Sequence, residues 1–223
     1  MRSEWQVRRE IVAIGRQLYQ RGLVVGTDGN LSARVHHDAI LVTPTGSCLG
    51  ELRAEELIAI PTELPPLTGR TTLRPTTELP MHLAAYEERP EIGAVIHAHP
   101  PLATALTLAG LSLAEAVLPE IVLHLGAVPT APYATPASEE GARAIRELIR
   151  RHDAILLARH GALSVGLDLR DAFHKLERVE HAARVLLAAQ TVGPLSALAL
   201  EEIERLAAMR ARSKSASDTP TIA

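Results

Sequence analysis

The sequence predicts one α/β domain whose sheet is mixed or largely antiparallel. Short strand-like runs alternate with helix-like segments along the 223 residues, and no internal repeat interrupts them. Neighbouring strands are joined by tight turns at 36–38 and at 159–161, and strands joined in this way run antiparallel. The regular strand–helix–strand rhythm of a doubly wound fold is absent. A hydrophobic share of 47% is typical of a globular chain and suffices for a sizeable core.

The expected helices are segments with apolar residues at spacings of three and four. Their ends carry the usual signals, with Gly22 after the first helix and Ser138 as the N-cap of a later one. The helices are expected at 4–21, 78–88, 102–108, 139–151, 169–190 and 197–212. Residues 111–127 are ambiguous and are compatible with a helix followed by a short strand.

The expected strands are short apolar runs bounded by turn-forming residues. They are expected at 31–35, 39–43, 57–60, 92–98, 128–134, 154–158 and 162–165. Residues 61–75 are rich in Pro and Thr and are expected to form a loop. Residues 1–212 are predicted to be a single domain, and the polar residues 213–223 a disordered tail.

Composition excludes several classes of protein. The formal net charge of -3 and the isoelectric point near 6.4 provide no basic field for nucleic acid or an anionic membrane. The single cysteine, Cys48, excludes an intrachain disulfide framework and a cysteine-based zinc finger, which fits a reducing compartment. The charged N-terminal segment lacks the apolar stretch of a secretory signal, and no apolar run is long enough to span a membrane. A cytoplasmic location is expected.

Three histidines are candidate metal ligands. His97 and His99 lie two apart at the end of a predicted strand, where alternation places both imidazoles on one face. His160 stands before Gly161, where a strand meets a turn and the backbone can approach a ligand closely. Three imidazoles from two strands would form a catalytic-type zinc site with an open position. The alternative is that these are ordinary core or surface histidines.

Glu78 lies upstream of these histidines, at the start of a predicted helix. In its simplest role the acid would favour the helix dipole, with Thr76 or Thr77 as the N-cap. In a functional role the carboxylate would bind a metal or act as a base beside it. His82, one helical turn later, would either orient Glu78 or be an ordinary core histidine with both nitrogens satisfied.

Turn residues and hydroxyls suggest a binding site for an anion. Thr76 and Thr77 stand at a helix N-terminus, where free N–H groups and hydroxyls favour phosphate. Two further turns could add amide and hydroxyl donors, or could be turns and nothing more. These turns are Gly29-Asn30 and Thr45-Gly46.

Five segments taken together resemble the class II aldolase/adducin-head family. In order along the chain they are GTDGNLSAR, VTPTG, TTELPMHLAAYEERPEIGAVIHAHPP, PYATP and LLARHGALSVGLDLRDAFHKLERVEHAARVL. The resemblance covers about residues 5–190. It implies a three-layer α/β/α fold around a central, largely antiparallel sheet. It also implies a homotetramer with active sites at the subunit interfaces.

The resemblance implies a role for each residue singled out above. A zinc ion would be held by His97, His99 and His160. Glu78 would be the catalytic acid/base and a further metal ligand when substrate is absent. The substrate phosphate would be bound by Gly29, Asn30, Thr45, Gly46, Thr76 and Thr77. Mn²⁺ or Co²⁺ would be possible in place of Zn²⁺, because imidazole ligands accept all three ions.

The function expected from the resemblance is zinc-dependent cleavage of a ketose 1-phosphate into dihydroxyacetone phosphate and an aldehyde. The substrate would be L-fuculose 1-phosphate or a related deoxyketose 1-phosphate. The metal would act as a Lewis acid, and Glu78 would move the proton at the enediolate carbon. A covalent Schiff-base route is disfavoured, because the only lysines are Lys175 on a charged helix and Lys214 in the predicted tail.

Two departures from the family pattern concern the chemistry. Thr76-Thr77 replaces the two serines of the fuculose-phosphate aldolases, which preserves the hydroxyls. Those aldolases also take a tyrosine proton donor from a neighbouring subunit, whereas this chain has no tyrosine between Tyr86 and Tyr133. The second catalytic acid is therefore unassigned. Glu120 and His124 lie in the corresponding region and are candidates for this acid. The alternative is that Glu120 is an ordinary surface acid and His124 an ordinary histidine on a helix face.

Other activities of the same family stay open. Sugar-phosphate epimerases of this fold carry Asp at the position of Glu78, so the glutamate favours an aldolase. Dehydratases and decarboxylases of sugar phosphates share the three-histidine site and are not distinguished from an aldolase by these residues. A non-catalytic adducin-like scaffold is disfavoured, because such domains lose the metal histidines that this chain retains.

Overall fold

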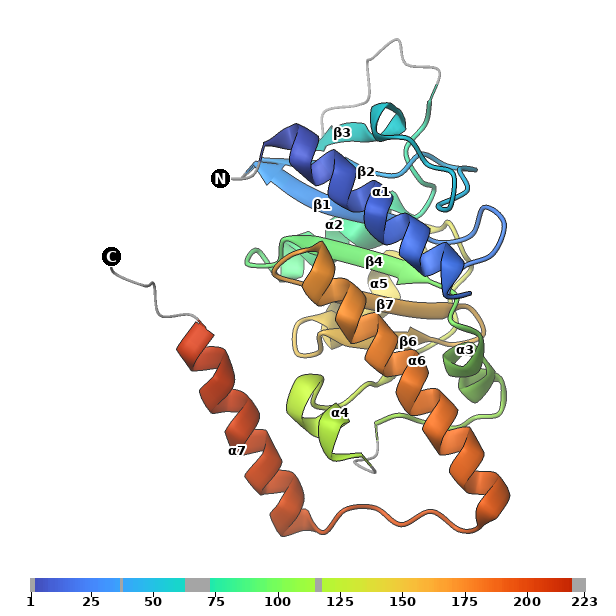
Figure 1. The fold of residues 1–223 in the computed structure, drawn as a ribbon, viewed down its shortest axis with the longest axis vertical. Coiled ribbons are helices and arrows are strands. Elements are labelled where there is room, and N and C mark those ends of the chain that lie inside the picture. Colours follow the sequence, from blue (N-terminus) through green and yellow to red (C-terminus); the bar gives the residue numbers. More distant parts are fainter. Residues whose placement is uncertain (1–2, 37, 63–72, 115–117, 218–223) are drawn as a thin grey trace.

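The computed structural model describes residues 3–36, 38–62, 73–114 and 118–217. These residues form a seven-stranded sheet with helices on both faces (Figure 1). The strands are β1 Asn30–His36, β2 Ala39–Val42, β3 Ile58–Pro61, β4 Ala94–Ala98, β5 Thr130–Ala131, β6 Ala154–Leu157 and β7 Gly161–Gly166. The helices are α1 Glu4–Gln20, α2 Leu79–Glu88, α3 Pro101–Leu108, α4 Pro119–His124, α5 Glu139–Ile149, α6 Leu169–Val192 and α7 Leu200–Ser217, with a 3₁₀ turn η1 Ala54–Glu56.

The strand order is β3-β2-β1-β4-β7-β6-β5. Every pair of neighbours formed by the described strands is antiparallel except β5 and β6. The centre of the sheet is the point where β4 lies between β1 and β7. There His97 is paired with Asn30 on one side and with Leu163 on the other. Residues from three distant parts of the sequence therefore meet at the middle of the sheet.

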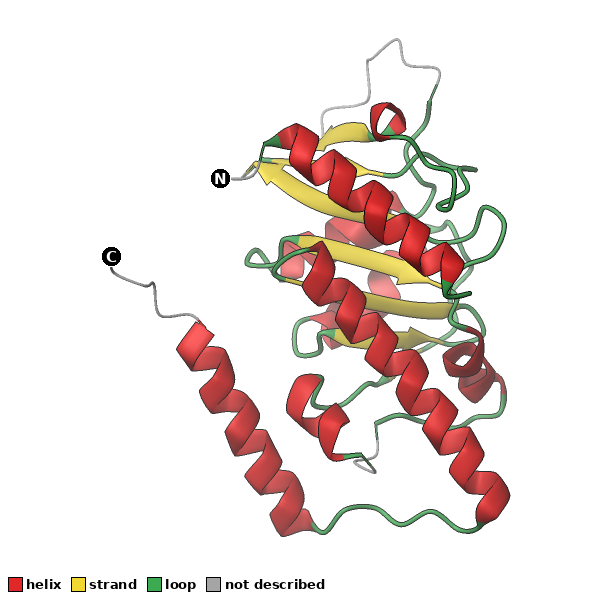
Figure 2. Cartoon of the chain, viewed as in Figure 1, coloured by secondary structure: helices red, strands yellow, loops and turns green. Residues whose placement is uncertain are grey.

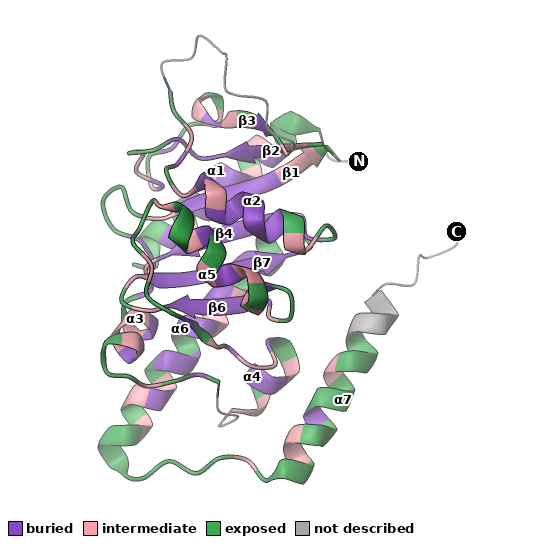
Figure 3. Ribbon diagram, turned by 180° about the vertical axis from the view of Figure 1, so that it is seen from behind, coloured by how far each residue is buried: buried purple, intermediate pink, exposed green. Residues whose placement is uncertain are grey.

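Helices α1 and α6 cover one face of the sheet, and Figure 2 shows both lying across it in the same view. Helices α2 and α5 cover the opposite face (Figure 3). Each face has its own apolar core, because successive strand residues point to opposite sides. On β4, Ile96 packs in the α1/α6 core and Val95 in the α2/α5 core. This arrangement confirms the predicted three-layer α/β/α fold, and alternation places His97 on the α2 side with Val95.

Helix α3 begins directly after His99 and is held by an acid from another helix. The side chain of Pro100 at its N-cap has no hydrogen-bond acceptor, so the first N–H groups need another partner. The buried Glu180 of α6 supplies it, since its two carboxylate oxygens accept from Leu102 N at 3.2 Å and Ala103 N at 2.9 Å. This cap fixes the path of the chain just beyond the two histidines of β4.

The start of α2 differs from the prediction. Its N-cap is Glu78, and neither Thr76 nor Thr77 takes that place. The hydroxyl oxygen of Thr76 instead accepts a hydrogen bond from the Glu78 N–H at 3.2 Å, so it caps the turn that precedes the helix. Pro80 stands in the first turn, where its missing N–H costs no helical hydrogen bond.

The C-terminal segment also differs from the prediction. Helix α7 continues to Ser217, so residues 213–217 of the expected tail are helical, and 218–223 lie outside the described residues. Two contacts explain why this polar segment is ordered as far as it is: Leu206 is buried, and Arg210 forms an ion pair with the buried Asp153. Most of the remaining surface of α7 is exposed (Figure 3).

The structure shows the local conformation of two shorter segments, 128–134 and the described part of 111–127. The expected strand at 128–134 is reduced to the two residues of β5, because Pro129 and Pro132 remove backbone donors on both sides. In the ambiguous 111–127 region, Pro119 opens α4 and Leu113 forms an isolated bridge to Val128. None of the described helices combines the length and the apolar character that crossing a bilayer requires.

Candidate active site

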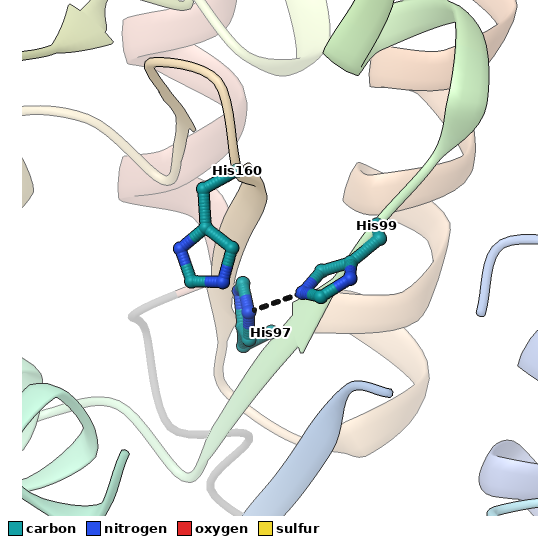
Figure 4. A group of neighbouring side chains, drawn as sticks. All are labelled: His97, His99 and His160. Carbon is teal, nitrogen blue, oxygen red and sulfur yellow. Dashed lines mark hydrogen bonds between the residues drawn. The ribbon is translucent and has the colours of Figure 1, made fainter. Parts of the chain in front are cut away.

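The structure brings the three predicted histidines together (Figure 4). His97 lies on β4, His99 one residue beyond its end, and His160 in the turn between β6 and β7. Their ring centroids are 4.7–4.9 Å apart, and their ligand atoms all lie within 4.8 Å of one another. A tetrahedral zinc ion with Zn–N bonds of about 2.0–2.1 Å would hold its nitrogens about 3.3 Å apart. The cluster therefore has nearly the dimensions of a three-histidine metal site.

The hydrogen bonds of two rings aim their Nε2 atoms at the cluster. His97 Nδ1 lies 3.0 Å from the carbonyl oxygen of Ala162, which can only accept, so Nδ1 carries the proton. The Asp28 carboxylate lies 3.3 Å from His99 Nδ1 and favours the same tautomer. Both Nε2 atoms then present lone pairs to each other at a distance of 3.0 Å. A cation between them would turn this repulsion into ligation, so the donor set fits a divalent metal ion.

The turn that carries His160 is tight and leaves no room for a larger residue after it. Arg159 has φ 60, an unusual value for a residue other than glycine, and its N–H donates to Thr107 Oγ1 at 2.9 Å. A Cβ atom at Gly161 would lie 2.3 Å from the carbonyl oxygen of Ala98 on β4. The glycine is thus required for close approach to the neighbouring strand, which places His160 beside the two histidines of β4.

The carboxylate of Glu78 points to the histidines. Its Oε2 lies 3.2 Å from His97 Nε2 and its Oε1 lies 3.5 Å from His160 Nε2. Oε2 also accepts a hydrogen bond from Asn30 Nδ2 at 2.8 Å. Among the described residues, the Glu78 side chain accepts no capping bond from its own helix. Its position is therefore explained by the histidine cluster and not by the helix dipole.

The environment keeps the cluster in the form that binds metals. Burial, reinforced by the neighbouring His160 and His99, lowers the pKa of His97 well below its ordinary value. Burial is also the largest cause of the lowered pKa of His160, and Glu78 opposes it. Both rings are therefore neutral near pH 7, and a neutral imidazole has the lone pair that ligation requires.

The predicted phosphate-binding residues fall into two groups. Backbone hydrogen bonds from Thr76 N to Thr43 O at 3.0 Å and from Thr45 N to Arg74 O at 2.9 Å place the turn after β2 beside the segment before α2. Thr45, Gly46 and Thr77 are exposed there, whereas Thr76 is buried. Phosphate binding by this group stays a prediction.

Gly29 and Asn30 form the second group. Gly29 has φ +79, and a Cβ atom there would lie 2.5 Å from Val24 Cγ1, so the turn needs glycine. Asn30 is buried, and its amide nitrogen is bonded to Glu78 while its amide oxygen lies 2.5 Å from His82 Nε2. In this structure Asn30 thus supports the carboxylate first, and one amide hydrogen remains for a ligand.

A small cavity of about 20 Å³, open to solvent, adjoins Glu78 and His160. Its other walls come from Met81, from Leu157 and from the loop that contains Pro132 and Pro136. These walls are mostly apolar.

The structure does not bring the two candidate second acids to this cluster. His124, at the end of α4, lines a different cavity together with Asp153, Lys175 and Arg210. Glu120 lies on the same short helix α4. Because the corresponding tyrosine of the aldolases belongs to a neighbouring subunit, a role for Glu120 or His124 as the second acid stays a prediction.

Sequence reasoning also missed residues that shape the site. Asp28 belongs to the predicted turn before β1, but nothing in its spacing indicated that it would reach His99. Thr107 was expected only as part of a helix, yet its hydroxyl oxygen accepts from the Arg159 N–H beside His160. Each contact joins residues more than 50 positions apart along the chain, which explains why no local pattern announced it.

Known proteins are similar to this chain in sequence and in fold. The family described as "Class II Aldolase and Adducin N-terminal domain" matches residues 9–187. This chain belongs to that family.

Similar proteins within the family catalyse more than one reaction. A 3-oxo-tetronate 4-phosphate decarboxylase of Pectobacterium atrosepticum is 37% identical over 188 residues, which are 82% of this chain and 85% of that protein. An L-fuculose phosphate aldolase of Methanocaldococcus jannaschii is 33% identical over 180 residues, covering 81% of this chain and 95% of that protein. The crystal structure of YgbL from Escherichia coli superposes with a TM-score of 0.82 at 33% identity, covering 92% of this chain and 99% of that one.

Proposed function

We propose that this protein is a metal-dependent lyase that decarboxylates a 3-oxo acid phosphate of the 3-oxo-tetronate 4-phosphate type. The carrying observation is the convergence of three imidazoles and the Glu78 carboxylate in a chain that is 37% identical to a decarboxylase named for that substrate. This replaces the aldol cleavage that the sequence favoured as the main activity. The enzyme class is the same, because both reactions are carbon–carbon lyase reactions of sugar phosphates.

The two reactions share their central intermediate. Decarboxylation of 3-oxo-tetronate 4-phosphate breaks the C1–C2 bond, carbon dioxide leaves, and the bonding electrons form the enediolate of dihydroxyacetone phosphate. Retro-aldol cleavage of L-fuculose 1-phosphate breaks the C3–C4 bond and leaves the same enediolate with an aldehyde as the other product. In both cases one proton must then be added to the carbon that lost its bond. One site can therefore serve either substrate. The departing group decides which proton-transfer groups the site needs.

The departing group favours decarboxylation in this chain. In a retro-aldol reaction the hydroxyl of the departing fragment must lose a proton, which requires a second acid/base group. The expected tyrosine is absent between Tyr86 and Tyr133. Carbon dioxide leaves without any proton transfer, so a single proton donor is sufficient. Glu78 is the group that we assign to this role.

The residues of the chain would divide the work as follows. His97, His99 and His160 would hold a divalent ion, which when bound would act as a Lewis acid toward the 3-oxo group. The Ala162 carbonyl and the Asp28 carboxylate keep two of the rings oriented. The Glu78 carboxyl would give its proton to C2 after carbon dioxide has left and would regain one from solvent.

Substrate binding would use the two turns at the rim of the site. The phosphate would be held by the hydroxyl and N–H groups of the residues predicted for it: Gly29, Asn30, Thr45, Gly46, Thr76 and Thr77. Zinc as the ion, the homotetramer with interfacial active sites and the cytoplasmic location stay predictions.

The test is product identification with the zinc-loaded protein. Three substrates are compared: 3-oxo-tetronate 4-phosphate, L-fuculose 1-phosphate and 5-deoxyribulose 1-phosphate. Because dihydroxyacetone phosphate is common to all three reactions, carbon dioxide and aldehyde are measured separately. We expect carbon dioxide release that is removed by a chelator and by Glu78→Gln, above the spontaneous rate without protein. Aldehyde formation without carbon dioxide release would overturn the proposal.

Aldol cleavage is the second candidate. The observation in its favour is Glu78 itself, together with the 33% identity to an L-fuculose phosphate aldolase. It predicts aldehyde formation that depends on a second proton donor. The same substrate panel distinguishes the two activities directly.

A further inference from the structure

A chain of buried hydrogen bonds extends from Glu78 into the layer between β1 and α2. Asn30 Nδ2 lies 2.8 Å from Glu78 Oε2, and Asn30 Oδ1 lies 2.5 Å from His82 Nε2. On the other side of the imidazole, His82 Nδ1 lies 2.7 Å from Ser32 Oγ, which is 3.0 Å from the Tyr86 hydroxyl. The four residues behind Glu78 are all buried. The large majority of polar groups at such depth have a hydrogen-bond partner, and each of these four has at least one.

The periodicities of the two elements bring these side chains together. Asn30 and Ser32 are two apart on β1 and point to the same face of the sheet. His82 and Tyr86 are four apart on α2 and lie on the same face of the helix, one and two turns after Glu78. Residues of α2 and β1 therefore alternate along the hydrogen-bond chain, which ends at the Glu78 carboxylate.

Chemistry fixes the direction of every bond in the chain. The Glu78 carboxylate accepts, so the amide nitrogen of Asn30 faces it and the amide oxygen faces His82. That oxygen needs a donor, so His82 carries its proton on Nε2. Burial lowers the pKa of His82 to about 3, so the ring is neutral and its Nδ1 accepts from the Ser32 hydroxyl. The Tyr86 hydroxyl then donates to Ser32, and all donors point toward Glu78.

We infer that His82 is a positioning residue for the proton donor, an inference that rests on the proposed function. Its Nε2–H holds the Asn30 amide in one of its two possible flips. In that flip an N–H holds Glu78 Oε2 on the His97 side. In the other flip the amide oxygen would face the carboxylate and repel it. Oε1 lies 3.5 Å from His160 Nε2, next to the cavity, and is the oxygen that would carry the transferable proton.

Two substitutions at the same position separate this role from simple packing. Glutamine at position 82 can place an amide N–H near the position of Nε2, whereas leucine fills space and offers no donor. We expect His82→Leu to lower kcat about 10- to 100-fold, the usual cost of losing a group that orients a catalytic residue, with little change in KM or bound metal. We expect His82→Gln to recover most of that loss. Equal losses in the two variants, or a loss confined to KM, would overturn the inference.

Ser32→Ala provides a matched control in the same buried chain. It removes the bond to His82 Nδ1 but leaves the bond from Nε2 to Asn30. We expect a smaller loss of kcat than in His82→Leu. A loss as large as that of His82→Leu would overturn the inference, because it would show that any disturbance of this layer has the same effect.

A spectroscopic measurement tests the positioning independently of the reaction. In the zinc-loaded protein labelled with ¹⁵N-histidine, long-range ¹H–¹⁵N spectra distinguish the two neutral tautomers of His82, assigned through His82→Gln. The inference requires a protonated Nε2 and an unprotonated Nδ1. The opposite tautomer would overturn it even if the protein is an active decarboxylase. If His82 has the required tautomer but the protein releases no carbon dioxide, the positioning role of His82 is supported and the proposed function is refuted.

Discussion

Two buried polar clusters of this molecule arrange their charged and hydrogen-bonding groups in opposite ways. In the first, three histidines and Glu78 direct their atoms at one point, and two Nε2 atoms face each other at 3.0 Å. In the second, the buried Asp153 is surrounded by Arg89 at 3.1 Å, Arg210 at 3.1 Å and Lys175 at 3.5 Å. The first cluster gathers donors that would suit a metal cation, whereas the second contains its own cationic side chains.

The difference shows how to separate a ligand site from a structural anchor. The charges around Asp153 pair with it and tie together α2, α6 and α7 with the start of β6, although the buried Arg210 Nε has no hydrogen-bond partner among the described residues. Such an arrangement contributes to the fold and offers little to a ligand, although it lines a cavity. The donors of the histidine cluster converge without mutual satisfaction, which is the arrangement that a metal ion and a substrate can complete.

The largest expected effect is on catalysis in the histidine cluster. Glu78→Gln keeps the shape of the side chain but removes the transferable proton, so kcat should fall about 10²- to 10⁴-fold. The three histidines are unchanged, so the metal content of the variant should stay close to that of the unmodified protein. Steady-state carbon dioxide release and elemental analysis measure the two quantities.

Glu87→Gln is the matched control on the same helix. Glu87 is exposed and pairs with Arg146 at the far end of α2. Its substitution should leave kcat unchanged. Equal activity in the two variants would remove Glu78 from the mechanism.

The next effect is on stability in the Asp153 cluster. Asp153→Ala leaves Arg89, Arg210 and Lys175 without their shared acid, which should destabilise the protein by about 3–5 kcal/mol. Urea unfolding measures this change, and faster proteolysis of α7 should accompany it because Arg210 loses its partner. Metal affinity should not change below the unfolding transition.

The matched control for this cluster is the exposed pair on α7. Arg205 contacts Glu202 at 2.7 Å with most of its side chain in solvent, so Arg205→Ala should change stability by at most about 1 kcal/mol. A similar loss in Asp153→Ala and Arg205→Ala would show that the buried cluster is no anchor.

A smaller effect concerns the pH dependence of the free energy of unfolding that His82 contributes. The pKa of His82 is about 3 in the folded protein, against an ordinary value of 6.5 in the unfolded chain. Between these values the unfolded chain binds a proton that the folded protein does not. The contribution of His82 is therefore complete above pH 6.5 and decreases by about 1.4 kcal/mol per pH unit as the pH falls toward 3.

Urea unfolding at pH 7 and pH 5, with a chelator present to remove metal, measures this change of the free energy of unfolding with pH. His82→Gln should reduce the difference between the two pH values, since glutamine does not titrate. An unchanged pH dependence in the variant would mean that His82 is protonated in the fold.

The sequence predicted the elements of the fold and the convergence of the three histidines for local reasons. Alternation alone placed His97 and His99 together, and the glycine after His160 indicated a close backbone approach. The order of the strands could not be predicted in this way, because β4 finds its neighbours β1 and β7 at opposite ends of the chain. The same limit applies to Asn30, whose partners Glu78 and His82 lie 48 and 52 residues away.

Other residues were misplaced for identifiable reasons. Within one chain His124 lines the Asp153 cavity, and its role as an acid for a neighbouring subunit stays a prediction. The residues 213–217 were expected to be disordered from their polar composition, yet the helix that Arg210 anchors extends through them. Ordering by one buried ion pair leaves no signal in local composition.

The most direct test of the central claim is a zinc titration of the metal-free protein, followed by calorimetry, in parallel with His99→Ala and Asp153→Asn. If the histidine cluster is the ligand site, the unmodified chain and Asp153→Asn bind one ion each with similar affinity, and His99→Ala loses tight binding. Tight binding that survives in His99→Ala, or that is lost in Asp153→Asn, would contradict the assignment of the metal to the three histidines.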